Sequence, residues 1–419
     1  MNPLKIGIDA RLSSGEAGGV EQFIVGLASG LSKLTDAPDE YWFLAYADSK
    51  DWIQPFLGGS CRILEDTTTP KESLGRRILK QRLPGLMNLL HEIDPRLFQR
   101  SISQVKSNGT IERAGIDVMH FTMQNAFLTE IPSIYHPHDL QHIHLPEIFS
   151  VRRRVLRDQM YRTFCEQASM VAAVSRFVKD DLLKNYQLPE EKVKVVPLAP
   201  VVTAYSESSL EDLERVRQKF SLPECFIFYP AQTWSHKNHI GLLNALALLR
   251  DEKRVKVEAV FSGRKDGFYK IIEQRVEELR LEDQVKFLDF VDPVELRSLY
   301  QLCRCVVIPT KFEAASFPLW EAFIMGVPAA CSNVTSLPEQ AGDAALLFDP
   351  DKPDEMACQI HKLWRDEKLR AELVEKGRRN VSRFSWERTA RTFRAHYRRI
   401  AQRELTDEDK EILSSPSLF

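Results

Sequence analysis

The sequence predicts an α/β protein with two Rossmann-like domains, each a parallel sheet with helices on both faces. Short runs rich in Val, Ile and Phe alternate with segments of helical period throughout the chain, which is the pattern of parallel strands joined by crossover helices. The alternation starts again near residue 225, after a charged stretch without strand signals. A chain of 419 residues also exceeds one ordinary core. We therefore expect two sheets that face a central cleft.

The individual elements follow from the length and spacing of these runs. The expected strands of the first half lie at 4–9, 41–46, 61–64, 116–121, 131–136, 170–175 and 193–196. Those of the second half lie at 225–230, 255–262, 285–288, 304–309, 327–331 and 345–348. Helical period marks the segments 20–34, 147–167, 238–250, 268–279, 293–303 and 353–384.

Residues 1–202 and 203–385 are assigned to the two domains, because the strand pattern pauses between them. The amphipathic segment 386–404 is expected to form a helix that crosses back onto the first domain. The last residues, 405–419, are acidic and then contain Ser and Pro, so we expect a frayed tail.

Charge and cysteine content exclude several classes of protein. Lys and Arg total 57 and Asp and Glu total 59, and this balance argues against a general nucleic-acid-binding protein. The seven cysteines are scattered and form no C-x-x-C pair, which indicates free thiols in a reducing cytosol. The N-terminus reads as a first strand, and no apolar run approaches the roughly 18–20 residues of a membrane span. We therefore expect a cytoplasmic protein.

One stretch, 71–106, interrupts the alternation of strands and helices. It carries eight Lys or Arg and three acids, interleaved with leucines. A basic amphipathic helix pair of this kind is able to lie on an anionic membrane surface. An insertion that packs on its own domain and exposes a basic face to water is the other interpretation, and the sequence slightly favours it.

Two loops that follow strands carry features of phosphate-binding sites. The first contains Gly18 and Gly19, which let the backbone approach a ligand beside the unpaired N–H groups of a helix start. The second contains Lys237 and Asn238, and an ammonium at a loop-to-helix junction can neutralise a diphosphate. A tight turn and an exposed loop lysine are the structural alternatives. The positions beyond strand ends favour ligand binding.

Four histidines crowd the stretch after the strand at 131–136, namely His136, His138, His142 and His144. His138, with Asp139 beside it, is the candidate to hydrogen-bond a sugar hydroxyl or to transfer a proton. A buried structural histidine is the usual alternative, and metal ligation is another. Because no Cys or Glu triad accompanies the histidines, we expect no metal site.

Two carboxylates, Glu313 and Glu321, stand eight residues apart after the strand at 304–309. The turn Ala314–Pro318 separates them, and a helix is expected to begin there. Glu321 then lies about one turn inside the helix and Glu313 on the loop, so the two reach different parts of a ligand. A Glu can accept two hydrogen bonds from a ribose diol. Surface acids on an ordinary helix are the alternative, which the small and apolar neighbours disfavour.

Together these motifs resemble the retaining glycosyltransferases of family 4 (group 1), which have the GT-B fold. The family pattern of two glutamates separated by seven residues stands here as Glu313-Ala-Ala-Ser-Phe-Pro-Leu-Trp-Glu321. The resemblance is strongest over 226–350. Further matching pieces are Gly18-Gly19-Val20-Glu21, Ser175-Arg176-Phe177, His236-Lys237-Asn238, Gly326-Val327-Pro328 and Pro338-Glu339-Gln340-Ala341-Gly342.

The resemblance implies a role for each matching residue. Glu321 would bind the nucleotide ribose, Glu313 would face the donor sugar and Lys237 would neutralise the diphosphate. His138 would touch the sugar from the other side, which makes Glu313, His138 and Lys237 the implied catalytic residues. Backbone or nucleobase contacts to the donor are implied for Gly18, Gly19, Val291, Ala315, Ser316 and Phe317.

Three positions depart from the family pattern. Gln232 stands where an Arg is usual, so one diphosphate charge is unmatched unless Arg264 or Lys265 supplies it. Ala and Ser replace glycines in the turn after Glu313, which narrows its backbone freedom. Asp289 replaces a common Gly. Phosphate affinity and base contacts are the properties that these departures affect.

The implied function is retaining, metal-independent transfer of a sugar from a nucleotide diphosphate sugar to a hydroxyl acceptor. The donor would be the only small molecule needed, with no cofactor, and the acceptor would be a glycan or a lipid-linked glycan of a bacterial surface polysaccharide. The second domain would bind the donor and the first the acceptor, with the enzyme peripheral at the inner face of the plasma membrane. A hydrolase or epimerase of the same fold is one alternative. A non-catalytic nucleotide-sugar-binding partner, suggested by Gln232, is the other.

Overall fold

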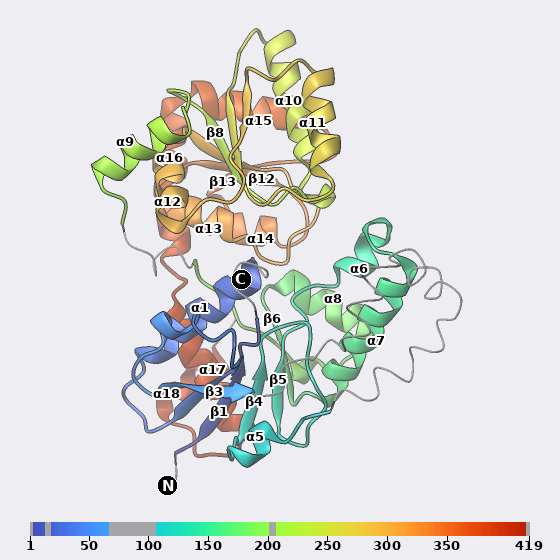
Figure 1. The fold of residues 1–419 in the computed structure, drawn as a ribbon, viewed down its shortest axis with the longest axis vertical. Coiled ribbons are helices and arrows are strands. Elements are labelled where there is room, and N and C mark those ends of the chain that lie inside the picture. Colours follow the sequence, from blue (N-terminus) through green and yellow to red (C-terminus); the bar gives the residue numbers. More distant parts are fainter. Residues whose placement is uncertain (1–2, 13–17, 67–105, 201–206, 416–419) are drawn as a thin grey trace. The chain divides into compact units, whose positions relative to one another are not determined.

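The computed structural model describes residues 3–12, 18–66, 106–200 and 207–415. The chain divides into two compact units, Met1–Leu198 with Trp386–Ser417 and Ala199–Ser385. Each unit is a parallel sheet with helices packed against it (Figure 1). The predicted α/β class with two Rossmann-like domains is therefore confirmed. The basic segment 71–106, apart from Lys106, lies outside the described residues.

The first unit contains a sheet of seven strands in the order β3-β2-β1-β4-β5-β6-β7, all of them parallel. Val, Ile, Phe and Met side chains are buried on these strands, as expected of a sheet covered on both faces. All seven predicted strands are present. Their bounds are β1 Lys5–Asp9, β2 Glu40–Tyr46, β3 Cys61–Asp66, β4 Val118–Phe121, β5 Ser133–Tyr135, β6 Met170–Ala173 and β7 Val193–Val195.

Helices complete the first unit, and the strand order in its sheet reverses between β1 and β4. Loops that follow two such strands diverge and leave room for a ligand at the carboxyl edge of the sheet. The loops after β1 and β4 are joined there by a hydrogen bond from the Thr122 hydroxyl to the Asp9 carbonyl. The α-helices of the described residues in this unit are α1 Gly19–Ser32, α5 Thr110–Arg113, α6 Gln141–His144, α7 Val151–Gln167, α8 Arg176–Tyr186, α17 Trp386–Ile400 and α18 Asp407–Ser414.

The second unit contains a sheet of six parallel strands in the order β10-β9-β8-β11-β12-β13. All six predicted strands are present, at β8 Ile227–Pro230, β9 Ala259–Ser262, β10 Val285–Phe287, β11 Cys305–Ile308, β12 Ala329–Ser332 and β13 Ala345–Phe348. The strand order reverses between β8 and β11. The helices are α9 Leu210–Lys219, α10 His239–Asp251, α11 Tyr269–Glu278, α12 Pro293–Leu302, α13 Phe317–Ile324, α14 Leu337–Ala341, α15 Pro353–Arg365 and α16 Glu367–Val381.

The helical segment predicted at 353–384 is interrupted at Asp366. Helix α15 ends before this residue and α16 begins after it. Asp366 has an extended backbone, and its side chain accepts a hydrogen bond of 2.9 Å from the Leu369 N–H. An Asp in this position satisfies an unpaired N–H at the start of a helix, so two helices form where the apolar period alone indicates one.

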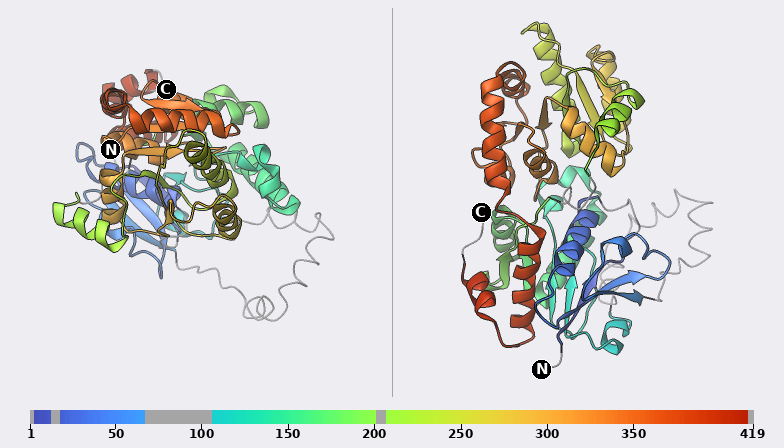
Figure 2. Two further views of the ribbon diagram at one scale, coloured as in Figure 1. Left: turned by 90° about the horizontal axis from the view of Figure 1, so that it is seen from above. Right: turned by 90° about the vertical axis from the view of Figure 1, so that its left-hand side faces the viewer.

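Helix α17 packs closely along α1, as Figure 2 shows. Two glycines of α1, Gly26 and Gly30, allow this approach, because a Cβ at Gly26 would lie 1.9 Å from the Trp386 ring. The small residues let the helix backbones come close while Trp386, Phe393 and Tyr397 fill the space beneath. The C-terminal helix is therefore part of the core of the first unit.

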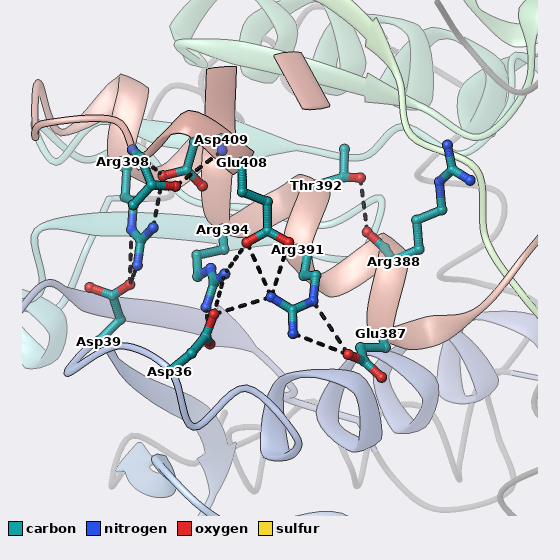
Figure 3. A network of polar contacts seen from close by, with 11 residues as sticks. Asp36, Asp39, Glu387, Arg388, Arg391, Thr392, Arg394, Arg398, Glu408 and Asp409 are labelled. Carbon is teal, nitrogen blue, oxygen red and sulfur yellow. Dashed lines mark hydrogen bonds and ion pairs between the residues drawn. The ribbon is translucent and has the colours of Figure 1, made fainter. Parts of the chain in front are cut away.

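The prediction of a frayed tail at 405–419 is wrong for residues 407–414, which form helix α18. A capping box starts the helix, with Thr406 and Asp409 each bonding the other's backbone N–H. Asp409 then meets the Arg398 guanidinium, which also contacts Asp39 at 2.7 Å (Figure 3). The acidic composition that suggested disorder instead neutralises arginines of α17.

Arg398→Met is expected to destabilise the first unit by about 3–5 kcal/mol, because it leaves the buried carboxylates of Asp39 and Asp409 without a counter-charge. Arg391→Met provides a matched control: Arg391 contacts Asp36, Glu387 and Glu408 at a partly exposed surface, where ion pairs contribute about 0–1 kcal/mol. Urea unfolding, monitored by hydrogen exchange at the backbone amides of α17, measures the free energy of unfolding of each variant. Equal losses for the two variants would contradict the assignment.

Candidate functional site

The loops after β8 and β11 lie side by side at the reversal of strand order in the second unit, and they bring together two of the predicted residues. Lys237 Nζ lies 2.5 Å from Glu313 Oε1, and both side chains are partly exposed to solvent. In open α/β sheets this edge is where ligands bind. The sequence separation of 76 residues gives no sign of the contact, which depends on the adjacency of the two strands.

Asn238 holds the Lys237 loop in place. It adopts the left-handed conformation with φ of 58° and caps α10 through its side chain, which accepts from the Gly241 N–H. Its amide also donates to the carbonyls of Pro309 and Pro350, at 3.0 and 2.9 Å. Asn tolerates this backbone conformation better than most residues. One side chain thus ties the loop after β8 to the loops after β11 and β13.

The Glu313 backbone is held by the turn after β12. Its N–H donates to Thr335 Oγ1 at 3.0 Å, and its carbonyl accepts from the Ser336 hydroxyl at 2.9 Å. On the other side, the Lys237 carbonyl accepts from the buried Tyr229 hydroxyl at 3.0 Å. Both members of the ion pair therefore project from fixed backbone, which is the condition for a preorganised charge at a ligand site.

In the turn before α13, not all three predicted backbone N–H groups, those of Ala315 to Phe317, are free to bind a ligand. The Ser316 N–H donates to Gln340 Oε1 at 2.8 Å, and Gln340 Nε2 donates back to the Ser316 carbonyl at 2.6 Å. Gln340 is buried, so this pair pins the turn. The Ser316 amide is thus already satisfied, while Ala315 and Phe317 donate no backbone hydrogen bond to any described residue. Sequence reasoning missed Gln340, although it stands in the matched Pro338–Gly342 motif.

Glu321 lies inside α13, as predicted, and it is buried. The Tyr300 hydroxyl, from α12, donates to Glu321 Oε2 at 2.6 Å. Burial raises the pKa of Glu321 to about 7, and the Tyr300 hydrogen bond acts in the opposite direction. Desolvation opposes the charged form of a carboxyl group, whereas a donor stabilises it. A buried carboxyl that titrates near neutrality is a feature of functional sites.

The remaining predicted residues of the second unit lie on neighbouring loops. Gln232 follows β8, and Gly263, with φ of 136°, allows the backbone there to pass closely. Val291 is buried, whereas its neighbour Phe290 is 70% exposed. Lys265, considered as a second phosphate cation, lies over the Tyr269 ring at 4.4 Å. The sequence singled out Val291, but the exposed side chain at this strand end is the aromatic ring of Phe290.

The first unit contains His138, Gly18 and Gly19 at the carboxyl edge of its own sheet. His138 has φ of 65°, and its Nε2 lies 2.7 Å from the Thr122 carbonyl. Burial lowers the pKa of His138, so the ring is neutral at physiological pH. Gly18 has φ of 49° at the start of α1, a conformation that favours glycine.

The four histidines do not converge on a common point. His136 stacks on His120 with 5.0 Å between ring centroids, His142 approaches Asp158 and His144 bonds Asp181. The Asp-x-Asp strings at 349–351 and 407–409 also have partners: Asp351 pairs with Lys311 and Asp409 with Arg398. Over the part of the chain that the structure describes, no group of three or more His, Cys, Asp or Glu is placed to hold a metal ion.

Comparison with known proteins agrees with this architecture. The model of the family "Glycosyl transferases group 1" matches residues 211–380, and that of "Glycosyltransferase Family 4" matches residues 17–199. The O-antigen chain mannosyltransferase B of Escherichia coli is 30% identical over 261 residues, which are 62% of this chain and 68% of that protein. The serotype-specific mannosyltransferase WbdA of Escherichia coli is 27% identical over 60% of this chain and 32% of that protein.

Among solved structures, HepE of Anabaena in complex with UDP and glucose superposes with a TM-score of 0.66 at 19% identity, over 94% of this chain and 99% of that one. The two parallel-sheet units and the placement of the matched motifs define a glycosyltransferase of the GT-B fold. The chain belongs to the group 1 glycosyl transferases, as the resemblance of its motifs implied. In the described part of the chain, no helix combines the length and the apolar character that crossing a membrane requires.

Proposed function

We propose that this glycosyltransferase moves a sugar from a nucleotide diphosphate sugar to a hydroxyl group of a bacterial surface glycan, with retention of the anomeric configuration. The observation that carries the proposal is the Lys237–Glu313 pair at the reversal of strand order, with the buried Glu321 on the adjoining helix. A cation, a carboxylate and a helix start at one sheet edge fit the diphosphate, sugar and ribose of such a donor.

Charge development on the leaving diphosphate is the step that these residues would assist. As the bond to the sugar breaks, negative charge gathers on the phosphate oxygens, and the Lys237 ammonium and the first N–H groups of α13 stabilise it. Glu313 keeps Lys237 extended toward this position until a donor arrives. Because a fixed lysine supplies positive charge, the proposal needs neither a metal nor a cofactor, and chelation with EDTA should leave turnover unchanged.

Mannose is the first sugar to test, because two relatives are named mannosyltransferases of O-antigen and serotype-specific chains. The same names support a polysaccharide or lipid-linked glycan as the acceptor. We place the reaction at the cytoplasmic face of the membrane, where nucleotide sugars are made and lipid-linked acceptors are accessible. His138, Gly18 and Gly19 keep their implied roles in sugar and phosphate binding.

A donor panel tests the proposed function. Thermal shift with UDP-, GDP-, dTDP- and ADP-linked sugars identifies the base and sugar that bind, and NMR of the product with an oligosaccharide acceptor reads the anomeric configuration. Stabilisation by one donor and a product of retained configuration are expected. An inverted product would refute retention.

Incubation with the donor alone separates the rivals. Free sugar or an epimer without acceptor would indicate a hydrolase or epimerase, and binding without turnover by any donor would indicate a non-catalytic partner. The test for a non-catalytic partner is included because Gln232 is neutral at a position where the family usually has a positively charged Arg.

Tyr300→Phe is expected to weaken donor binding and to move its pH dependence. The carboxylate form of Glu321 accepts ribose hydroxyls, so affinity should rise as pH rises through about 7, where burial sets the pKa of Glu321. The Tyr300 hydroxyl stabilises that carboxylate. Removing it raises the pKa of Glu321 further, and the inflection moves to higher pH. Calorimetric titration with the nucleoside diphosphate across neutral pH measures this, and an unmoved inflection would argue against the pairing.

A further inference from the structure

A cavity of about 310 Å³ opens in the first unit between α7 and the loop after β4. The loop contributes Gln124 and Asn125, and the helix and the residues before it contribute Phe149, Arg153, Leu156 and Met160. The loop is fixed, because the buried Tyr135 hydroxyl donates to the Gln124 carbonyl at 2.7 Å. The cavity belongs to the first unit, whereas the Lys237–Glu313 pair belongs to the second, and it has amide, cationic and apolar walls.

Two arginines line this cavity, and only one of them has a hydrogen-bond acceptor for its guanidinium among the described residues. Arg157 donates to Asp139 at 3.2 Å and to the Tyr161 hydroxyl at 2.6 Å. Arg153, one turn earlier on α7, is exposed, and its guanidinium meets no acceptor among the described residues. An uncompensated guanidinium at the mouth of a cavity is suited to a phosphate, which it can bind through two parallel N–H groups.

The cavity adjoins the loop that carries His138. Arg157 is held by Asp139, the residue after His138, and the Thr122 carbonyl that His138 contacts lies two residues before Gln124. A ligand in the cavity would thus have its phosphate at Arg153 and its hydroxyl groups near the amides of Gln124 and Asn125, on the side of His138. Phe149, Leu156 and Met160 offer an apolar wall for a sugar face or the first carbons of a lipid chain.

We propose that this cavity binds the acceptor, and that Arg153 makes the enzyme select acceptors that carry a phosphate beside the accepting sugar. The proposal rests on the proposed transferase function and adds the chemical class of its acceptor: an anionic, amphipathic glycosyl phosphate or diphosphate. Phe149, Leu156 and Met160 of the cavity wall supply the apolar surface for such an acceptor.

Calorimetric binding of a hexosyl octyl diphosphate, compared with the neutral octyl hexoside, tests the proposal without requiring turnover. Arg153→Gln should weaken binding of the diphosphate about tenfold to hundredfold, because a hydrogen bond to a charged group is lost, and should leave the neutral glycoside unchanged. Arg62→Gln removes the same charge from an exposed position on β3 and should change neither. Equal affinity of wild type and Arg153→Gln for the diphosphate would overturn the proposal.

Two further measurements are needed. One distinguishes a glycosyl diphosphate from a membrane headgroup as the anion that Arg153 binds, and the other distinguishes failure of this proposal from failure of the proposed function. Sedimentation with phosphatidylcholine vesicles, with and without phosphatidylglycerol, asks whether Arg153 binds a membrane headgroup instead. Arg153-dependent binding to anionic vesicles with no binding of the soluble diphosphate would overturn the acceptor assignment.

The affinity for the donor should be equal in wild type and Arg153→Gln. If wild type bound no nucleotide sugar, the proposed function would be refuted. The titration with the acceptor analogue would still decide the role of Arg153.

Discussion

Lys237→Ala is expected to lower kcat by about 10²–10³-fold, the loss typical of removing one preorganised group that stabilises transition-state charge. Lys237 stands at the carboxyl edge of β8 on a loop fixed by Asn238. The diphosphate carries more negative charge as it leaves than in the bound donor, so the ammonium favours the transition state over the ground state. The fall in kcat should therefore exceed any rise in donor KM, and steady-state kinetics with varied donor measures both.

Lys311→Ala is the matched control for this variant. Lys311 belongs to the neighbouring loop, but its ammonium pairs with Asp351 at 2.5 Å on an exposed surface. Turnover in this variant should stay within about twofold of wild type, because exposed ion pairs contribute little. If Lys237→Ala also kept full turnover, or if only KM rose, Lys237 would not act on the leaving group.

Glu321→Gln is expected to weaken donor binding about tenfold to hundredfold while leaving the protein folded. The glutamine keeps an oxygen for the Tyr300 hydroxyl but loses the carboxylate that accepts the ribose diol, and hydrogen bonds to charged groups are the stronger ones. Calorimetry with the nucleoside diphosphate measures the change. The 2′,3′-dideoxy analogue should bind wild type and variant equally, and a loss for this analogue as well would contradict ribose recognition.

Glu321→Gln should unfold less readily than wild type in mildly alkaline buffer, although it binds the donor more weakly. The pKa of Glu321, about 7, is raised by burial above that of an exposed carboxyl. Glu321 therefore costs the folded state nothing at pH below its unfolded pKa. The cost grows as pH rises from that value to about 7, and it stays at its full size at higher pH. Glutamine removes this cost, so Glu321→Gln should be more stable than wild type in mildly alkaline buffer, as thermal unfolding at two pH values would show.

Much of the site could be predicted because strand-end loops and motif spacing are local properties. Lys237 and the two glutamates follow β8 and β11 in the order the motifs indicate, and α13 begins where the turn ends. The partners of these residues could not be predicted. Gln340 reaches Ser316, and Tyr300 reaches Glu321, only because α14 and α12 pack beside α13. Gln340 stands in a matched motif, but the sequence does not indicate the partner of either side chain.

Local patterns were enough to predict the thirteen strands that the described residues form, the parallel α/β class and the place of the candidate site after two of those strands, because apolar period and turn chemistry act over a few residues. Contacts between distant elements set most of the remaining features. The acidic tail packs on α17 through the ion pair of Asp409 with Arg398. The division of one predicted helix into two is instead local, because it comes from the cap at Asp366, which the apolar period does not reveal. Strand order sets which loops meet, so the Lys237–Glu313 contact exists only once β8 and β11 are neighbours. Interactions between residues far apart in sequence depend on packing, which no local pattern encodes.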